Sequence, residues 1–173
     1  MTKPRIALAS IALGGALGVA VFAAAAKFDP AVLNGDKKEV AARLLKEAET
    51  LAGKGSWERI AVGRVHYLAG RKEQGKALFD AVLAGKAEAS DFTRIGAVYA
   101  MAGETDKAKE MYEKALALKP GSARILAEAG AWRNLKGDHD KAKELFTRSL
   151  TADPDDFWDR ITIAASYEGQ EPF

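Results

Sequence analysis

The feature that most constrains this chain is an internal repeat of 34 residues. Residues 89–122 align without gaps with residues 123–156, and the string DKAKE occurs at the same place in both segments. The other coinciding positions are Gly96/Gly130, Gly103/Gly137, Ala108/Ala142, Tyr112/Phe146, Ala115/Ser149 and Pro120/Pro154. A fixed period of this length is typical of a repeat protein, in which each unit buries its apolar face only against its neighbours.

The repeated residues predict a pair of helices in each unit. In the first copy, Gly103 follows the first helix and suits a left-handed C-cap, and Pro120 ends the second helix. Gly96 lies inside the first helix, where glycine costs about 1 kcal/mol relative to alanine. We therefore expect another helix to pass close to it, with the small Ala108 at the crossing and Tyr112 filling the gap one turn later.

Weaker copies flank these two units. Residues 56–88 form a first repeat that lacks the closing proline and has Gly75 where the later copies have alanine. Residues 36–52 have the spacing of a single second helix and read as a half repeat. Residues 157–169 read as one more first helix that caps the stack.

This pattern resembles the tetratricopeptide-repeat (TPR) family. The residues that carry the resemblance are Gly96, Tyr99, Ala108, Tyr112, Ala115 and Pro120, then Gly130, Ala142, Phe146, Ser149 and Pro154. The resemblance implies an all-α fold, a TPR superhelix of antiparallel helical hairpins with about three repeats plus flanking half-repeat helices. It also implies protein or peptide binding and no enzymatic activity.

The N-terminal segment predicts export. Residues 1–5 are basic, and residues 6–26 carry no charge. Ala24 and Ala26 precede Lys27 with the small-residue spacing of a signal-peptidase site. The alternative is an uncleaved signal anchor, because this run is just long enough for ~30 Å of hydrocarbon. Residues 27–173 then form the TPR domain, located in a bacterial periplasm or anchored to the inner membrane and facing the periplasm.

Charge and composition argue against several functions. Removing Lys3 and Arg5 from the 26 basic residues leaves 24, equal to the 24 acidic residues, so the folded part has no basic excess for nucleic acid. The chain has no cysteine, which removes disulfides and thiolate chemistry. We expect no cofactor, and contact with a membrane only through residues 6–26 if they remain uncleaved.

Two sets of residues invite a catalytic or metal-binding interpretation. The two histidines, His66 and His139, occupy repeat positions that indicate packing. The acidic cluster Asp153, Asp155, Asp156 and Asp159 lacks the spacing of a calcium loop and precedes a predicted helix, where carboxylates are favourable without metal. No nucleophile elbow, phosphate-binding loop or zinc-protease motif is present. We therefore predict neither catalytic nor metal residues.

The resemblance places a peptide-binding groove on the concave wall formed by the first helices. The family's groove positions correspond to Trp57, Arg64, Tyr67, Arg94, Ala97, Met101, Arg124, Ala131, Asn134 and Trp158. Arginine binds carboxylates with two parallel hydrogen bonds, so the arginines suggest a partner with an acidic side chain or a C-terminal carboxylate. The alternative is that these arginines pair with neighbouring glutamates.

The sequence therefore favours a non-catalytic adaptor or scaffold of the bacterial cell envelope. Two alternatives stay open. One is a structural TPR module that associates with itself as a homo-oligomer, and the other is an accessory subunit of an envelope enzyme complex.

Overall fold

The computed structural model describes residues 29–171, and all the secondary structure in that range is helical. The predicted export segment, residues 1–26, and its cleavage position lie outside the described residues. The chain divides into two compact units, residues 1–34 and 35–173. In the first unit the described structure is a single 3-10 turn, η1 (Pro30–Leu33), capped by the Asp29 side chain. Among the described residues, no helix has both the length and the apolar character needed to span a bilayer.

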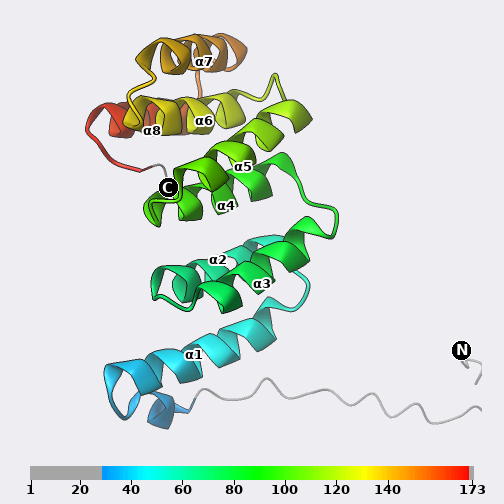
Figure 1. The fold of residues 1–173 in the computed structure, drawn as a ribbon, viewed down its shortest axis with the longest axis vertical. Coiled ribbons are helices and arrows are strands. Elements are labelled where there is room, and N and C mark those ends of the chain that lie inside the picture. Colours follow the sequence, from blue (N-terminus) through cyan, green and yellow to red (C-terminus); the bar gives the residue numbers. More distant parts are fainter. Residues whose placement is uncertain (1–28, 172–173) are drawn as a thin grey trace, which may run out of the picture. The chain divides into compact units, whose positions relative to one another are not determined.

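The second unit consists of α-helices joined by short turns (Figure 1). The helices are α1 (Lys37–Ala52), α2 (Ser56–Leu68), α3 (Lys72–Leu83), α4 (Ala89–Met101), α5 (Thr105–Leu118), α6 (Ala123–Leu135), α7 (His139–Ala152) and α8 (Phe157–Tyr167).

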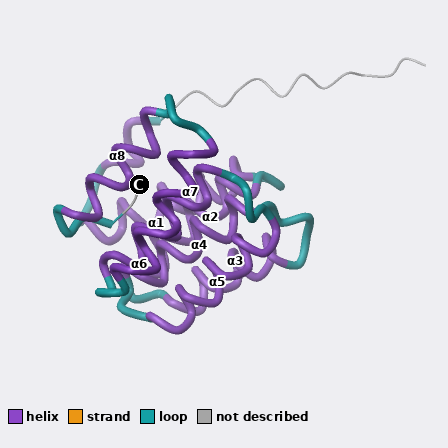
Figure 2. Tube along the Cα trace, turned by 90° about the horizontal axis from the view of Figure 1, so that it is seen from above, coloured by secondary structure: helices purple, strands orange, loops and turns teal. Residues whose placement is uncertain are grey.

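These helices form three hairpins, which confirms the predicted all-α repeat fold. The most extensive contacts join α2 to α3, α4 to α5 and α6 to α7. The first helices of successive hairpins also touch, α2 against α4 and α4 against α6, while α1 packs on α2 and α8 packs on α6. Figure 2 looks along the stack, where the helices of successive hairpins overlie one another.

Each hairpin depends on a glycine in its first helix. A Cβ atom on Gly63 would lie 2.6 Å from the Phe79 ring, and one on Gly130 would lie 2.6 Å from the Phe146 ring. At Gly96 the nearest atoms, on Met111 and Tyr112, would be 3.2 Å away. Only a residue without a side chain lets an aromatic ring of the second helix lie this close to the first, as the sequence predicted.

The first hairpin crosses even more closely than the other two. Gly75 of α3 stands where the later repeats have alanine, and a Cβ there would lie 2.6 Å from the Gly63 carbonyl oxygen. Glycine replaces alanine at this position because the backbones of α2 and α3 cross more closely than those of the later hairpins. At the ends of α4 and α6, Gly103 and Gly137 adopt positive φ values of 76° and 83°. This confirms the C-caps expected there.

Aromatic residues fill the space between the hairpins. The Tyr67 and Phe79 rings both meet Tyr99, with centroids 5.4 and 5.9 Å away in edge-to-face geometry. Tyr112 and Trp132 stack at 5.3 Å, so Trp132 is a core residue. Edge-to-face and offset stacked arrangements are the favourable geometries for aromatic pairs.

A carboxylate joins the first repeat to the second. Glu104, just before α5, accepts hydrogen bonds from the Tyr67 hydroxyl at 2.8 Å and from the ammonium groups of Lys72 and Lys107 at 2.6 and 2.7 Å. The lysines, and then the tyrosine, stabilise the charged form of Glu104. They lower the pKa of Glu104 from its ordinary value of 4.5 to about 2.

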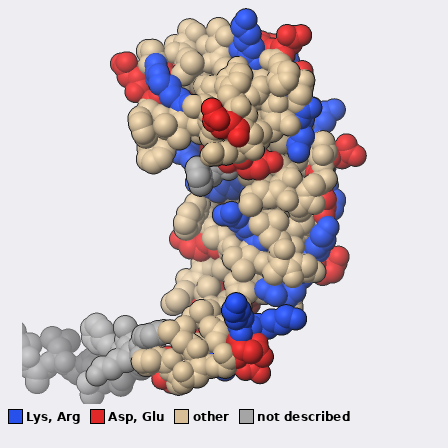
Figure 3. All heavy atoms as spheres, turned by 90° about the vertical axis from the view of Figure 1, so that its left-hand side faces the viewer, with Lys and Arg blue, Asp and Glu red and all other residues tan. Residues whose placement is uncertain are grey.

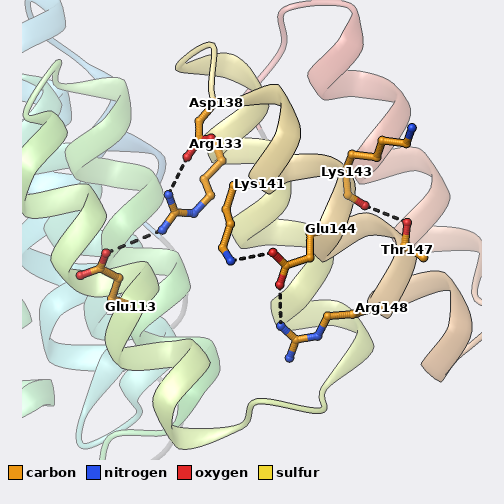
Figure 4. A network of polar contacts seen from close by, with 8 residues as sticks. All are labelled: Glu113, Arg133, Asp138, Lys141, Lys143, Glu144, Thr147 and Arg148. Carbon is orange, nitrogen blue, oxygen red and sulfur yellow. Dashed lines mark hydrogen bonds and ion pairs between the residues drawn. The ribbon is translucent and has the colours of Figure 1, made fainter.

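Mixed charges cover the outer face of the later repeats (Figure 4). Arg133 lies between Asp138, at 2.8 Å, and Glu113 of the preceding hairpin, at 3.7 Å. Glu144 pairs with Lys141 at 2.6 Å and Arg148 at 3.7 Å on α7 itself. The pairs of Glu144 are exposed, and exposed pairs contribute about 0–1 kcal/mol each, so they add solubility more than stability.

We predict that Gly130→Ala lowers the free energy of unfolding by about 1 kcal/mol. Overpacking against the Phe146 ring costs about 1–3 kcal/mol, and the better helix propensity of alanine offsets about 1 kcal/mol of that. The measurement is urea denaturation followed by circular dichroism. The control is Gly121→Ala, where no atom lies within 4 Å of the added methyl. Equal stability of the two variants would contradict the close-approach argument.

We predict that Glu104→Gln lowers the free energy of unfolding by about 1–2 kcal/mol at pH 7, because it weakens two charged hydrogen bonds at a mostly buried carboxylate. A depressed pKa stabilises the fold above the unfolded value. The difference from wild type should therefore shrink as the pH falls from about 4.5 toward 2. Denaturation at several pH values measures it. Glu110→Gln, which removes an exposed pair with Lys114, should change little at any pH.

Candidate functional site

A cavity of about 510 Å³ opens on the wall formed by α2, α4 and α6. The predicted groove residues that line it are Trp57, Arg64, Arg94, Ala97, Met101 and Arg124. These residues come from three successive hairpins, so the stacking of the first helices is what brings them together. The face of the molecule shown in Figure 3 is hollowed at mid-height. Basic and acidic side chains lie next to each other at that hollow.

Four other predicted groove residues lie away from this cavity. Tyr67 is buried and directs its hydroxyl to Glu104. Ala131 is buried among Ala142 and Phe146. Asn134 is buried, and its side-chain amide donates to the Ser166 hydroxyl at 3.1 Å. Trp158 is exposed on α8, outside the cavity.

The position of α8 explains why Ala131 and Asn134 do not line the cavity. Because α8 packs extensively on α6, the C-terminal half of α6 is covered. Ala131 and Asn134 lie in that half, and they serve the α6–α7–α8 packing. The open wall therefore ends near Arg124 and Glu128, at the start of α6.

The floor of the cavity is apolar. Ile60 of α2, Val98 of α4 and Tyr112 of α5 are all buried and contribute to the lining. At the rim, Trp57 and Met101 keep 57% and 42% of their surface exposed. Exposed large apolar side chains beside a concave surface mark sites where another molecule binds.

The three arginines of the cavity differ in how far they are already engaged. Arg124 donates from Nε to Glu128 at 2.8 Å, as the internal-pairing alternative expected. Arg94 has only Asp91 at 3.7 Å, beyond hydrogen-bond distance, and Asp91 accepts instead from the Glu88 backbone. Arg64 has no ion pair or hydrogen bond with any of the described residues. Two guanidinium groups are thus open to a ligand.

Sequence reasoning missed several lining residues. Glu128 follows Arg124 by one helical turn. Side chains at this spacing meet on a helix, so the sequence alone could have predicted that the two residues pair. The repeat pattern gives Tyr112 only a packing role and does not single out Val98. Glu171, which follows α8, also lines the cavity, and no repeat position predicts it because it lies beyond the last repeated element.

The groups considered for catalysis or metal binding have structural partners. His66 Nδ1 accepts from Arg71 Nε at 2.9 Å, so the neutral ring donates from Nε2 to Glu49, 2.7 Å away on α1. His139 lies exposed at the start of α7, in contrast to the expected packing role, and its Nδ1 lies 2.8 Å from Asn134 Oδ1.

The acidic cluster serves the start of α8. Asp156 accepts from the Asp159 backbone amide at 2.7 Å, which is the helix cap expected there. Asp159 in turn accepts from the Ser149 hydroxyl at 3.1 Å. Among residues 29–171 no group of acidic and histidine side chains has a metal-binding arrangement.

Comparison with known proteins agrees with the repeat architecture. The family model described as "Tetratricopeptide repeat" matches residues 92–122 and 134–156. The matched segments and the repeated hairpins identify the chain as a tetratricopeptide-repeat protein, a class of helical scaffolds that bind other proteins.

Comparison with individual proteins adds little to this. Among solved structures, the chain is similar to a crystal structure of MamA, with 25% identity, a TM-score of 0.49 and coverage of 68% of each chain. No curated protein matches the sequence.

Proposed function

We propose that this protein is an adaptor or scaffold of the bacterial cell envelope that binds an acidic segment of a partner protein in the cavity formed by α2, α4 and α6. The observation that carries the proposal is the pairing of an apolar floor with two open arginines. Arg64 has no ion pair within the described residues, and Arg94 has only a distant one. A carboxylate between them gains charge-assisted hydrogen bonds, while apolar neighbours bury against Ile60 and Trp57.

A second feature supports a protein partner over a small molecule. The cavity is lined by residues of three successive hairpins, which suits an extended segment. Peptides held in this way gain affinity from a few anchors surrounded by weaker contacts. Trp57 and Met101 at the rim have the exposure expected of such anchors.

The proposed location follows from the N-terminal sequence. A basic start, an uncharged run over residues 6–26 and small residues before Lys27 suit export to the periplasm, with the mature repeat domain beginning at Lys27. Retention of the segment would instead anchor the domain at the inner membrane, still facing the periplasm.

We predict that reversing both open arginines, Arg64→Glu together with Arg94→Glu, abolishes capture of the partner from envelope extract. Each lost charged hydrogen bond is worth about 1.5–3 kcal/mol, or about tenfold or more in affinity. Affinity capture followed by mass spectrometry measures it. The matched control, Lys109→Glu with Lys143→Glu, makes the same charge change outside the cavity and should retain the partner. Circular dichroism must show equal helicity for all three proteins.

The same capture distinguishes the two other functions that the sequence left open. Recovery of this protein alone would favour a self-associating module, for which the exposed Phe157 and Trp158 of α8 offer an apolar surface. Recovery of an enzyme subunit by both variants alike would move the binding surface away from the cavity and favour an accessory subunit.

We predict that the protein isolated from an envelope fraction begins at Lys27. The Ala24–Ala26 spacing fits signal peptidase, and an N-terminal mass measurement reads the start directly. An Ala26→Leu variant should remain uncleaved, because the enzyme requires a small residue next to the cut. An intact N-terminus in the wild type would support the anchored form.

A further inference from the structure

The cavity already contains a carboxylate from this chain. Glu171 follows α8, yet its side chain lines the same cavity as Arg64, Arg94 and Arg124. The chain reaches this place through a turn after Tyr167. Gly169 adopts a positive φ of 74°, and the Gln170 backbone amide donates to the Ala165 carbonyl at 2.9 Å. Figure 1 shows the segment after α8 leaving the stack and turning back toward α4.

Electrostatics agree with this placement. Burial raises the pKa of the Tyr112 hydroxyl, and the carboxylates of Glu128 and then Glu171 raise it further. Tyr112 belongs to the floor of the cavity. Glu171 therefore lies within electrostatic range of Tyr112, a residue of the cavity floor.

Glu171 is poorly stabilised where it lies. It is half-buried, and its Oε2 atom is enclosed without a hydrogen-bond partner in the described part of the chain. Burial raises its pKa, and the only opposing charge effect comes from Lys136, which is not a cavity residue. An enclosed carboxylate oxygen without a partner has lost its hydrogen bonds to water and gained none in return, which is unfavourable. The contact is thus weak and easily reversed.

We propose that Glu171 is an intramolecular occupant of the cavity, and that an acidic partner segment must displace it to bind. The inference rests on the proposed function, because it takes acidic segments as the ligands of this cavity. Glu171 is itself an acidic side chain held against the apolar floor, but it forms no ion pair with Arg64 or Arg94. A partner whose carboxylate reaches those arginines makes the bonds that Glu171 lacks.

The presence of Glu171 in the cavity lowers the apparent affinity of the cavity for a partner. A ligand that binds only the open form sees its affinity reduced by the fraction of protein that is open. If the occupant were present in about 80–90% of molecules, binding would be about five- to tenfold weaker. Segments that offer only apolar side chains gain nothing from the free arginines, so displacement favours acidic partners.

Nuclear magnetic resonance of the full chain tests the placement first. Glu171→Gln should shift the backbone amide signals of Ala61 and Val98, which line the cavity on α2 and α4. The matched control is Glu168→Gln, an exposed residue of the same segment that does not line the cavity, and it should leave both signals in place. Unchanged Ala61 and Val98 signals in Glu171→Gln would overturn the proposal.

The second step titrates a probe, the amidated peptide YEGQEPF with the sequence of residues 167–173, and follows the same two signals. Amidation removes the terminal carboxylate, so the peptide tests the acidic side chains. We expect a midpoint about five- to tenfold lower for a chain ending at Gly169, which lacks the occupant, than for wild type or Glu168→Gln. The peptide YEGQQPF should bind more weakly to every protein.

The outcomes separate this inference from the proposed function. Equal midpoints for wild type and the chain ending at Gly169, with binding lost in Arg64→Glu/Arg94→Glu, would overturn the inference and keep the cavity as an acidic-segment site. No shift in any protein at millimolar peptide would overturn both. A lower midpoint for the shortened chain that persists when Arg64 and Arg94 are both changed to glutamate would also overturn the inference. The probe would then bind outside the cavity.

Discussion

The structure depends on the contact between a glycine of each first helix and an aromatic ring of the second. Gly63, Gly96 and Gly130 let the two helices of each hairpin lie so close that a single added carbon would meet Phe79, Tyr112 or Phe146. Packing at this density has little room to adjust, so it fixes the rotation of each first helix about its axis. The opposite side of α2 and α4 is then free to form the cavity wall.

The same stacking determines where the cavity ends. On α4, Arg94 and Ala97 lie on the open side, whereas on α6 the residues of the last turns are covered by α8. The buried pair Asn134–Ser166 locks that contact with a hydrogen bond, which a buried amide requires. A repeat array needs such a terminal helix, because the last hairpin has no further neighbour to cover its apolar face. In this chain the capping helix also shortens the groove.

The fold was predictable because its signals are local and repeated. Gly103 and Gly137 mark helix ends, and the glycine–aromatic spacing marks each hairpin, so the helices and their pairing follow from positions that recur. The groove was predictable only in part. Arg64, Arg94 and Ala97 follow the repeat register, but whether Asn134 is open or buried depends on a terminal helix that has no counterpart inside the array.

Glu171 could not be found from the repeat at all, because its position is set by the turn at Gly169 and the cover that α8 gives to α6.

The distribution of charge along the cavity gives the proposed binding a direction. Near α6, Arg124 is already paired with Glu128, so that end offers no open guanidinium group to a ligand carboxylate. Near α2 and α4, the guanidinium groups are open above an apolar floor. An acidic residue of a bound segment is therefore stabilised at the α2–α4 end, and its apolar residues suit the floor toward α6. A segment in the reverse orientation places its carboxylate beside Glu128, and like-charge contacts of this kind are how interfaces exclude wrong arrangements.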